Sequence, residues 1–381
     1  MVTVMVYFDN AASTYPKPYS VSKSVGSWIY RNGANPGRSG HRASIEASEV
    51  VYETRQRLAD FFGVNNCENI IFVPSATFGL NLIIQGIFSE GDHVITTDLE
   101  HNSVLRPLNM ISKKNIEYDI ATVELSDDQS TVNNIVSLIK KNTKAVICTQ
   151  CSNVCGRIMP LKMISESIPN NVKFIVDGSQ GAGIIPTDLS KLGIDYYCAP
   201  SHKGLMGPQG SGFIAIKSDV PRPLITGGTG SESFNLNQPD YLPDSLESGT
   251  LPTPVIVGLN EGIKYIQSVG IDRIFDYKNM LTKYLYDSLN DIDCIIKYVS
   301  YERLKYIGCV CFNVEGHSSD EVSIYLADNG ICVRSGIHCA PLFHQKMKTE
   351  KVGMVRVSFG CFNKISEIDF LVKKLKKYLK K

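Results

Sequence analysis

The chain alternates short runs of apolar, β-branched residues with longer segments in which apolar residues recur every three or four positions. Each short run predicts a buried strand, and each longer segment predicts a helix that covers the sheet. We expect strands over residues 69–73, 93–97, 144–149, 172–176, 195–199 and 212–216. We expect helices over residues 44–62, 76–87, 103–113 and 131–140. This order predicts an α/β fold with a mostly parallel sheet and helices on both faces.

The composition changes between residues 227 and 254, where Gly, Ser, Asn and Pro predominate and the periodicity is lost. Such a segment predicts a long excursion that ends at a domain boundary. We therefore expect a large domain over residues 15–254 and a smaller α+β domain over 255–381, joined by the N-terminal segment 1–14. In the smaller domain we expect helices over 255–269, 275–289 and 366–379, and strands over 307–314 and 354–358.

The charges are balanced, with 39 Lys and Arg against 38 Asp and Glu, so no global field attracts nucleic acid or an anionic membrane. The opening apolar run, residues 2–8, is too short to span a membrane and lacks the basic flank of a signal peptide. Eleven scattered cysteines indicate reduced thiols rather than a disulfide framework. We expect a cytoplasmic protein that acts on a small ligand.

Polar residues follow two consecutive expected strands. Asp177 ends the first, with Gln180 shortly after it, and His202 and Lys203 follow the second. Because ligands bind outside the carboxyl ends of strands in an open α/β sheet, these side chains could converge on one crevice. A desolvated lysine amine could hold a carbonyl cofactor as a Schiff base, and a neighbouring carboxylate could keep a pyridine nitrogen protonated.

Two more strand ends carry candidate residues. Ser75, Ala76 and Thr77 begin a helix whose free amides could bind a phosphate, although Ser75 or Thr77 could equally be a simple helix cap. His101 ends another strand, where an imidazole could lie against a planar cofactor and shuttle protons, or serve as an incidental polar cap.

Two other classes of protein were weighed against this interpretation. Cys148, Cys151 and Cys155 suggest an iron–sulfur or zinc-binding redox protein, but no fourth ligand is evident nearby and Cys148 falls in an expected strand. A nucleotide-binding Rossmann domain lacks its signature, because no G-x-G-x-x-G follows the first strands and the glycine-rich segment 207–212 precedes a strand instead of a helix.

The chain resembles the cysteine desulfurase and selenocysteine lyase branch of the class-V aminotransferases, which are PLP-dependent transferases of fold type I. The resemblance covers nearly the whole chain and rests on motifs that occur in the family's order: Asp9-Asn10-Ala11-Ala12, Ala76-Thr77, Glu100-His101-Asn102-Ser103, Ser152-Asn153-Val154-Cys155-Gly156, Asp177-Gly178-Ser179-Gln180, Ser201-His202-Lys203, Ser248-Gly249-Thr250 and Arg334-Ser335-Gly336-Ile337-His338-Cys339-Ala340.

The resemblance implies that Lys203 forms a Schiff base with pyridoxal 5'-phosphate (PLP), that Asp177 pairs with the pyridinium nitrogen and that His101 stacks on the ring. It implies contacts to the phenolic oxygen side of the ring from Gln180 and Asn153. It also implies that the phosphate of PLP is bound by Ala76, Thr77 and His202. Thr250 would join them from the second subunit of a homodimer. Pro200 stands where relatives usually place a Ser or Thr, so Ser201 is expected to take over that hydrogen bond if it is not lost.

The resemblance further implies that L-cysteine is converted to L-alanine while its sulfur becomes a persulfide on Cys339, for transfer to an acceptor protein. Arg356 would grip the substrate carboxylate. We expect His338 and Arg334 to favour the thiolate of Cys339. The short segment 335–356 is similar to the compact cysteine loop of the group II, lyase-like members. A selenocysteine lyase, or another β-elimination or amino-transfer activity that does not use Cys339 as nucleophile, remains the alternative.

Overall fold

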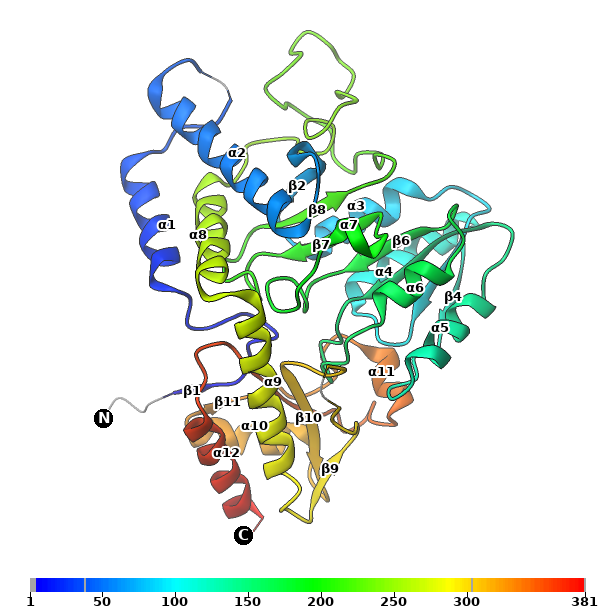
Figure 1. Ribbon diagram of the computed structural model, residues 1–381, viewed down its shortest axis with the longest axis vertical. Coiled ribbons are helices and arrows are strands. Elements are labelled where there is room, and N and C mark those ends of the chain that lie inside the picture. The colour runs from blue at the N-terminus through cyan, green and yellow to red at the C-terminus, as the bar shows by residue number, and fades with distance from the viewer. Residues whose placement is uncertain (1–4, 38, 303, 380–381) are drawn as a thin grey trace.

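Five neighbouring strands run in the same direction and form most of a seven-stranded sheet (Figure 1). The computed structural model describes residues 5–37, 39–302 and 304–379. The sheet has the order β2-β8-β7-β6-β5-β3-β4 and consists of β2 (Ile70–Val73), β3 (His93–Thr97), β4 (Glu117–Ala121), β5 (Thr143–Thr149), β6 (Lys173–Asp177), β7 (Tyr196–Pro200) and β8 (Gly212–Ile216). β8 runs antiparallel to both of its neighbours, β2 and β7. The expected mostly parallel α/β sheet is confirmed.

Successive residues of each central strand enter two different cores, one on each face of the sheet. In β5, Val146 and Cys148 pack on one face and Ala145 and Ile147 on the other, as the two-residue repeat of a strand requires. The first face is covered by α2 (Arg42–Phe62), α5 (Asp128–Ser137), α6 (Leu161–Ser167), α7 (Leu189–Leu192) and α8 (Thr253–Val269). The second is covered by α3 (Ala76–Ile87) and α4 (Asn102–Ile111). Burial on both faces explains the continuous apolar runs of these strands.

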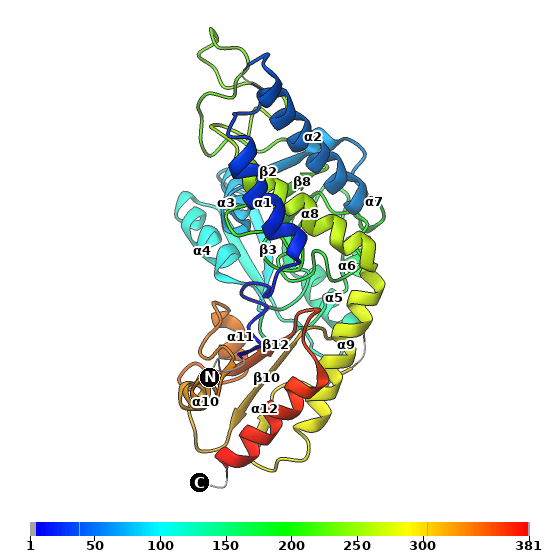
Figure 2. The same cartoon turned by 90° about the vertical axis from the view of Figure 1, so that its left-hand side faces the viewer.

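The carboxyl-terminal part of the chain forms a second, smaller layer together with the N-terminal segment (Figure 2). It contains two sheets, with the strand orders β12-β10-β9 and β1-β11. Their strands are β1 (Val6–Tyr7), β9 (Ile295–Lys297), β10 (Cys309–Val314), β11 (Ile331–Cys332) and β12 (Val355–Ser358). The helices of this part of the chain are α9 (Ile271–Ser288), α10 (Ser319–Asp328), α11 (Pro341–Lys346) and α12 (Ile365–Tyr378). Val6 and Phe8 join the core of this layer, so the N-terminal segment packs with the end of the chain.

The domain division at residues 254/255 stays a prediction. α8, which begins at that point, packs against α2 and against α1 (Tyr19–Arg31), on the side of the large sheet. α9 then continues into the smaller layer (Figure 2). Residues 2–4 of the opening apolar run lie outside the described residues. Among the described residues, no helix is long and apolar enough to cross a membrane.

The excursion between β8 and α8 contains no helix or strand, and all of its residues are described. It projects beyond the sheet (Figure 1), and the side chains of Phe234 and Leu236 on it are fully exposed. Its end is fixed by a buried ion pair in which Arg55 donates to both carboxylate oxygens of Glu247 at 2.8 Å. Glu247 also accepts the amide of Phe72 in β2 at 2.6 Å.

Breaking this ion pair should strongly destabilise the protein. Glu247→Gln leaves the Arg55 guanidinium buried without its countercharge, so we expect the free energy of unfolding to fall by about 3–5 kcal/mol. The matched control is Glu166→Gln, which removes an exposed 3.8 Å pair with Lys162 and should change it by less than about 1 kcal/mol. Denaturant titration of both variants measures the difference, and equal effects would contradict the importance of burial.

Candidate active site

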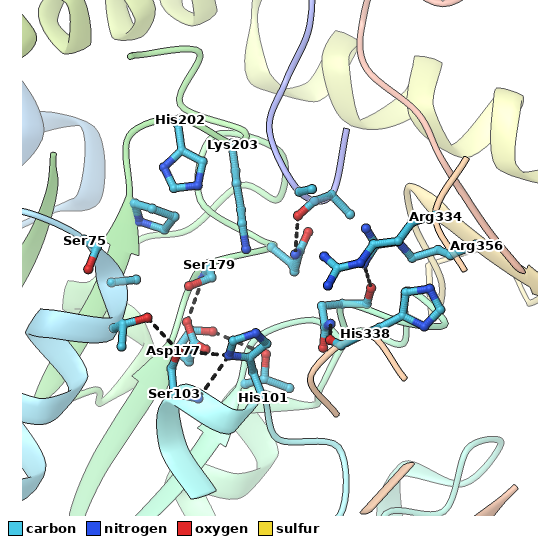
Figure 3. A pocket seen from close by; sticks show the side chains of 18 residues that line it. Ser75, His101, Ser103, Asp177, Ser179, His202, Lys203, Arg334, His338 and Arg356 are labelled. Carbon is cyan, nitrogen blue, oxygen red and sulfur yellow. Dashed lines mark hydrogen bonds between the residues drawn. The ribbon is translucent and has the colours of Figure 1, made fainter. Parts of the chain in front are cut away.

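Many polar side chains gather at the carboxyl ends of the parallel strands (Figure 3). They surround a cavity of about 250 Å³, whose lining residues are Ala11, Ala12, Ser75, Ala76, Thr77, His101, Ser103, Thr149, Asn153, Asp177, Ser179, Gln180, Pro200, His202, Lys203, Arg334, His338 and Arg356. The structure thus brings together nearly all of the sequence-predicted residues. Lys203 and His202 enter from one side, Asp177 and His101 lie opposite, and the arginines gather at one end (Figure 3).

Lys203 is held by backbone contacts that leave its amine in the cavity. The Thr14 hydroxyl donates to the Lys203 carbonyl at 2.6 Å. A Cβ on Gly204 would lie 2.2 Å from the Ala182 carbonyl oxygen, so only glycine allows the chain to turn there. Burial lowers the pKa of the Lys203 amine to about 8, although the negative charge of Asp177 acts in the opposite direction. The amine is therefore partly neutral near pH 8 and able to act as a nucleophile.

Asp177 is the last residue of β6 and is 3% exposed. Its Oδ1 accepts the amide of Ser179 at 2.9 Å. A Cβ on Gly178 would lie 2.1 Å from the ring of Tyr197, so this glycine lets the strand end pack closely against β7. The carboxylate faces the cavity beside Lys203 and can form an ion pair with a cationic group placed there.

His101 caps helix α4 and faces the cavity. Its Nδ1 accepts the amide of Ser103 at 3.0 Å, so the proton of the neutral ring is on Nε2. Burial is the main cause that lowers the pKa of His101 to about 4, with the negative charge of Asp177 acting against it and the positive charge of Lys203 in the same direction. The two roles expected from the sequence are therefore compatible, because the ring is both a helix cap and a neutral donor at the cavity.

Glu100 makes hydrogen bonds that hold the cavity wall next to His101. Its Oε1 accepts the Thr97 hydroxyl at 2.6 Å and the Thr149 amide at 3.0 Å, which ties β3 to β5. Burial raises the pKa of the Glu100 carboxyl to about 8, so the carboxyl is protonated at neutral pH. It contributes hydrogen bonds to the wall without adding a negative charge at neutral pH.

The end of the cavity at the start of helix α3 is suited to an anion. Ser75 caps helix α3 by accepting the Phe78 amide at 3.1 Å, and the Thr77 hydroxyl is 2.8 Å from that of Ser103. The backbone amides of the first turn of α3 point toward the cavity end, where the helix dipole favours negative charge. His202 lies beside them with its Nδ1 buried and without a hydrogen-bond partner, and burial lowers its pKa to about 4.

Arg356 occupies the other end of the cavity and is 1% exposed. Its Nη1 donates to the Asn153 carbonyl at 2.7 Å, and its Nη2 pairs with Asp9 at 2.6 Å. Its Nε is buried and has no hydrogen-bond partner among the residues that the structure describes. Gln180 on the neighbouring wall donates to the Ala11 carbonyl at 3.0 Å. The guanidinium is oriented on two sides and retains a free donor for a ligand carboxylate.

Cys339 lies in a strained loop next to this end. His338 and Cys339 both have positive φ angles, 53° and 56°, which non-glycine residues rarely adopt. The side-chain amide of Asn153 donates to the His338 carbonyl at 2.7 Å, and the backbone amide of Asn102 donates to the Cys339 carbonyl at 2.8 Å. Cys339 is half-buried, and its sulfur is 4.0 Å from Nη2 of Arg334.

Two expectations need revision at this site. His338 supplies no positive charge to Cys339, because burial and the nearby arginines lower its pKa to about 2. The Arg334 guanidinium is the charged group in contact with the Cys339 sulfur. Ser201 does not face the cavity, since its buried hydroxyl contacts the carbonyls of Pro208 and Ser211. Thr250 is exposed and does not line the cavity of its own chain, so its expected role at the phosphate of the neighbouring subunit stays a prediction.

Sequence reasoning assigned no role to Ser103 or Ser179, which both line the cavity. Each lies inside a motif that carried the resemblance, one or two residues from a residue that was assigned a role. The chemical signal was present in both as a hydroxyl. Which of these side chains points into the cavity depends on backbone turns that the sequence does not specify.

The cysteine cluster expected as an alternative metal site consists of buried thiols. Cys148, Cys151 and Cys155 are free, and burial raises the pKa of each thiol. Across the described parts of the chain, no group of three or more His, Cys, Asp or Glu side chains is placed to hold a metal ion.

Comparison with known proteins identifies the family of this site. The profile of the aminotransferase class-V family matches residues 6–371. The chain belongs to this family, in its cysteine desulfurase branch. A probable cysteine desulfurase of Borreliella burgdorferi is 31% identical over an alignment of 392 positions, gaps included, which covers 99% of this chain and 92% of that protein. A cysteine desulfurase of Salmonella agona is 32% identical over 384 residues, covering 97% and 92%.

Solved structures agree with this assignment. The apo structure of the cysteine desulfurase from Thermococcus onnurineus NA1 has a TM-score of 0.92 and 30% identity, and the match covers 99% of this chain and 95% of that one. The cysteine desulfurase CsdA from Escherichia coli has a TM-score of 0.89 at 22% identity, which supports the fold alone. The family consists of PLP-dependent enzymes, and the fold is that of PLP fold type I.

The lowered pKa of Lys203 can be measured directly. We expect acetic anhydride to acetylate Lys203 in cofactor-free protein with a midpoint near pH 8, against about 10.4 for an ordinary lysine. Asp177→Asn removes the charge that raises this pKa, so the midpoint should move to lower pH. Mass spectrometry across pH 6–10 gives the Lys203 midpoint in the parent and in Asp177→Asn, with exposed Lys162 as the reference amine. A midpoint equal to that of the reference would show that the amine is not desolvated.

Proposed function

We propose that the protein is a PLP-dependent cysteine desulfurase that converts L-cysteine to L-alanine and leaves the sulfur as a persulfide on Cys339. The observation that carries the proposal is the shared cavity of Lys203 and Asp177, with Arg356 at one end and the Cys339 loop beside it. A nucleophilic amine, a buried carboxylate and a carboxylate-binding arginine are the groups that an amino-acid substrate and a pyridine aldehyde cofactor require.

The cavity residues fit PLP. The unpartnered Nδ1 of His202 and the amides at the start of α3, at Ala76 and Thr77, lie where a phosphate would need donors. Asp177 would pair with the ring nitrogen, His101 would lie against the ring, and Asn153 and Gln180 would contact its oxygen side. When bound by Lys203, PLP would supply an electron sink for the substrate's carbon framework.

The remaining steps belong to side chains of this protein. Arg356 binds the substrate carboxylate through its free Nε and a terminal nitrogen, which orients the amino acid. The Nζ of Lys203 removes the proton from the α-carbon, as its lowered pKa allows. The sulfur of Cys339 then attacks the substrate sulfur, and the Arg334 guanidinium at 4.0 Å stabilises negative charge on the attacking atom.

The compact loop that holds Cys339 is half-exposed, so a persulfide there would be accessible to an acceptor protein in the manner expected of the group II-like members. Selenocysteine lyase activity is separated from this proposal by substrate. Purified protein is assayed with L-cysteine and with L-selenocysteine for alanine, while the absorption of bound PLP is recorded before and after each addition. Turnover of selenocysteine alone would favour the lyase.

Cys339 should be required for sulfur transfer. We expect Cys339→Ala to bind PLP and L-cysteine with unchanged spectra but to release alanine from L-cysteine at least about 100-fold more slowly, because the nucleophile is absent. The control is Cys294→Ala, which removes an exposed thiol just before β9. Alanine release and mass-spectrometric detection of a 32-Da adduct are the measurements. Parent-like rates in Cys339→Ala would rule out the persulfide route.

The proposed homodimer explains two features that a single chain leaves without a contact. Thr250 is exposed beside Gly249, whose φ is +94°, and would reach the phosphate of the neighbouring subunit. Phe234 and Leu236, on the same excursion, expose their whole side chains. Apolar side chains that are this exposed on a long excursion are typical of a surface covered by a partner.

We expect the double substitution Phe234→Ser and Leu236→Ser to weaken the dimer by at least about tenfold, because two apolar side chains would no longer be buried at the interface. Ile324→Ser, which removes an exposed apolar side chain from α10, is the control. Light scattering over a dilution series gives the dissociation constants. A parent protein that is an active monomer would contradict the dimer.

A further inference from the structure

A second, smaller cavity, the inner cavity, shares Ala11, Gln180 and Lys203 with the active-site cavity. Its other walls include Lys278 of helix α9 and Cys309 at the start of β10. The volume of the inner cavity is about 20 Å³. A cavity needs at least about 10–15 Å³ to hold one water molecule. The inner cavity therefore has room for a single species of the size of a water molecule or a halide ion.

Helix α9 holds Lys278 against a glycine at this cavity. Thr282 donates its hydroxyl to the Lys278 carbonyl at 2.7 Å and accepts the Gly308 amide at 3.0 Å. A Cβ on Gly308 would lie 3.1 Å from Cε and 3.4 Å from Nζ of Lys278. The charged end of the lysine side chain therefore packs against the backbone at Gly308, next to Cys309 in the cavity wall.

The Lys278 amine has no countercharge. Its residue is 7% exposed, and it makes no hydrogen bond or ion pair with any residue that the structure describes. Burial lowers the pKa of this amine, and the groups that act against burial are the thiols of Cys309, Cys361 and Cys151. Burial raises the pKa of all three thiols, so they are neutral and supply no negative charge. Because buried charges in proteins are normally paired, an unpaired ammonium at a cavity wall points to an anion that the chain does not supply.

The rest of the inner cavity also favours an anion. Lys203 is the second lysine of its wall, and no Asp or Glu occurs among the described residues that line it. Two side-chain oxygens of the wall are engaged elsewhere. The Oδ1 of Asn10 accepts the Tyr15 amide at 3.1 Å, and the Thr14 hydroxyl donates to the Lys203 carbonyl at 2.6 Å. A cavity with two lysines and no carboxylate has the charge that attracts a small anion.

We propose that the inner cavity is a binding site for one monovalent anion of halide size, held by the ammonium of Lys278. Such an anion would balance the buried positive charge, which a water molecule in the same place would leave uncompensated. Polyatomic anions such as sulfate are too large for a cavity of this volume. The proposal does not depend on the proposed function, because Lys278 does not line the active-site cavity.

The position of the site connects it to the amine of the active site. Lys203 lines both cavities, and the Cys309 thiol influences the pKa of Lys203 as well as that of Lys278. A negative charge in the inner cavity would stabilise the protonated form of Lys203 and raise the pKa of its amine. The anion would therefore reduce the neutral fraction of Lys203 at a given pH.

The first test locates the anion directly. Crystals of the purified protein are soaked in sodium bromide, and diffraction data are collected at the bromine absorption edge. We expect an anomalous peak in contact with Nζ of Lys278 in the parent and none at this place in Lys278→Met, which replaces the ammonium by an apolar side chain of similar length. A cavity that contains density without an anomalous signal holds water, and this result would overturn the proposal.

The second test measures binding in solution. Thermal unfolding is followed in sodium chloride and in sodium gluconate at equal ionic strength, because gluconate is too large to enter the cavity. A ligand that binds only the folded state stabilises it in proportion to its occupancy, so we expect chloride to raise Tm by about 2 °C or more. Lys278→Met should lose this difference, and Lys162→Met, which changes an exposed lysine, should keep it. Equal Tm values of the parent in the two salts would contradict binding, whether or not the Lys278 variant folds.

The third test measures the effect on Lys203. The acetylation midpoint of Lys203 in cofactor-free protein is compared in the same two salts. We expect chloride to move this midpoint to higher pH by about 0.5 unit or more in the parent, and to leave it unchanged in Lys278→Met. A parent midpoint that is equal in both salts would overturn the connection between the anion and Lys203.

The anion site and the proposed function fail separately. A protein that desulfurates L-cysteine but has no bromide at Lys278 would refute the anion site alone. Bromide at Lys278 in a protein that does not desulfurate L-cysteine would refute the proposed function and leave the anion site established.

Discussion

The shared direction of the parallel strands is the constraint on which the site depends. Because β6 and β7 are parallel neighbours with Asp177 opposite Cys198, their carboxyl ends deliver the carboxylate and the Lys203 loop to the same edge of the sheet. β2, β3 and β5 add the start of α3, His101 and Asn153 at that edge. Reversing one of these strands would move its residues to the far edge. The reactive properties of Lys203 follow from this convergence, since burial favours its neutral form while Asp177 limits the shift.

The sequence predicted the central strands well, and the physical reason is their burial on both faces. Each of the six expected strands is an apolar run, and each overlaps an observed strand of the large sheet. β4 was missed because it is an edge strand: in Glu117–Ala121 only Ala121 is buried, so its sequence carries no apolar run. α1 was missed for a similar reason, since Val21 is its one buried residue. Elements that pack weakly leave weak patterns.

The site was predictable in its residue types but not in its electrostatics. A histidine next to Cys339 suggested a cation, and the structure makes it neutral because His338 is buried beside two arginines. Ser201 follows β7 as expected, but its hydroxyl turns toward Pro208 and Ser211, away from the cavity. Both outcomes depend on the direction of a side chain and on the packing around it. Motif order contains neither.

Three neutral histidines change how the cavity can bind its ligands. His101, His202 and His338 all have lowered pKa values, so the fixed positive charges on the walls are the two arginines, with Lys203 partly charged. The arginines lie at the Cys339 end, where the proposed function places the substrate carboxylate at Arg356 (Figure 3).

A phosphate at the opposite end would rely on neutral donors, namely the α3 amides and His202. A dianion held by dipoles does not draw the arginines away from the substrate, and a neutral His101 does not repel a protonated pyridine ring beside Asp177. In the proposed function, the two anionic groups would therefore bind at opposite ends of the cavity, the phosphate to neutral donors and the carboxylate to a charged one. This division follows from burial, because burial is what removes charge from the histidines and leaves it on the guanidinium groups.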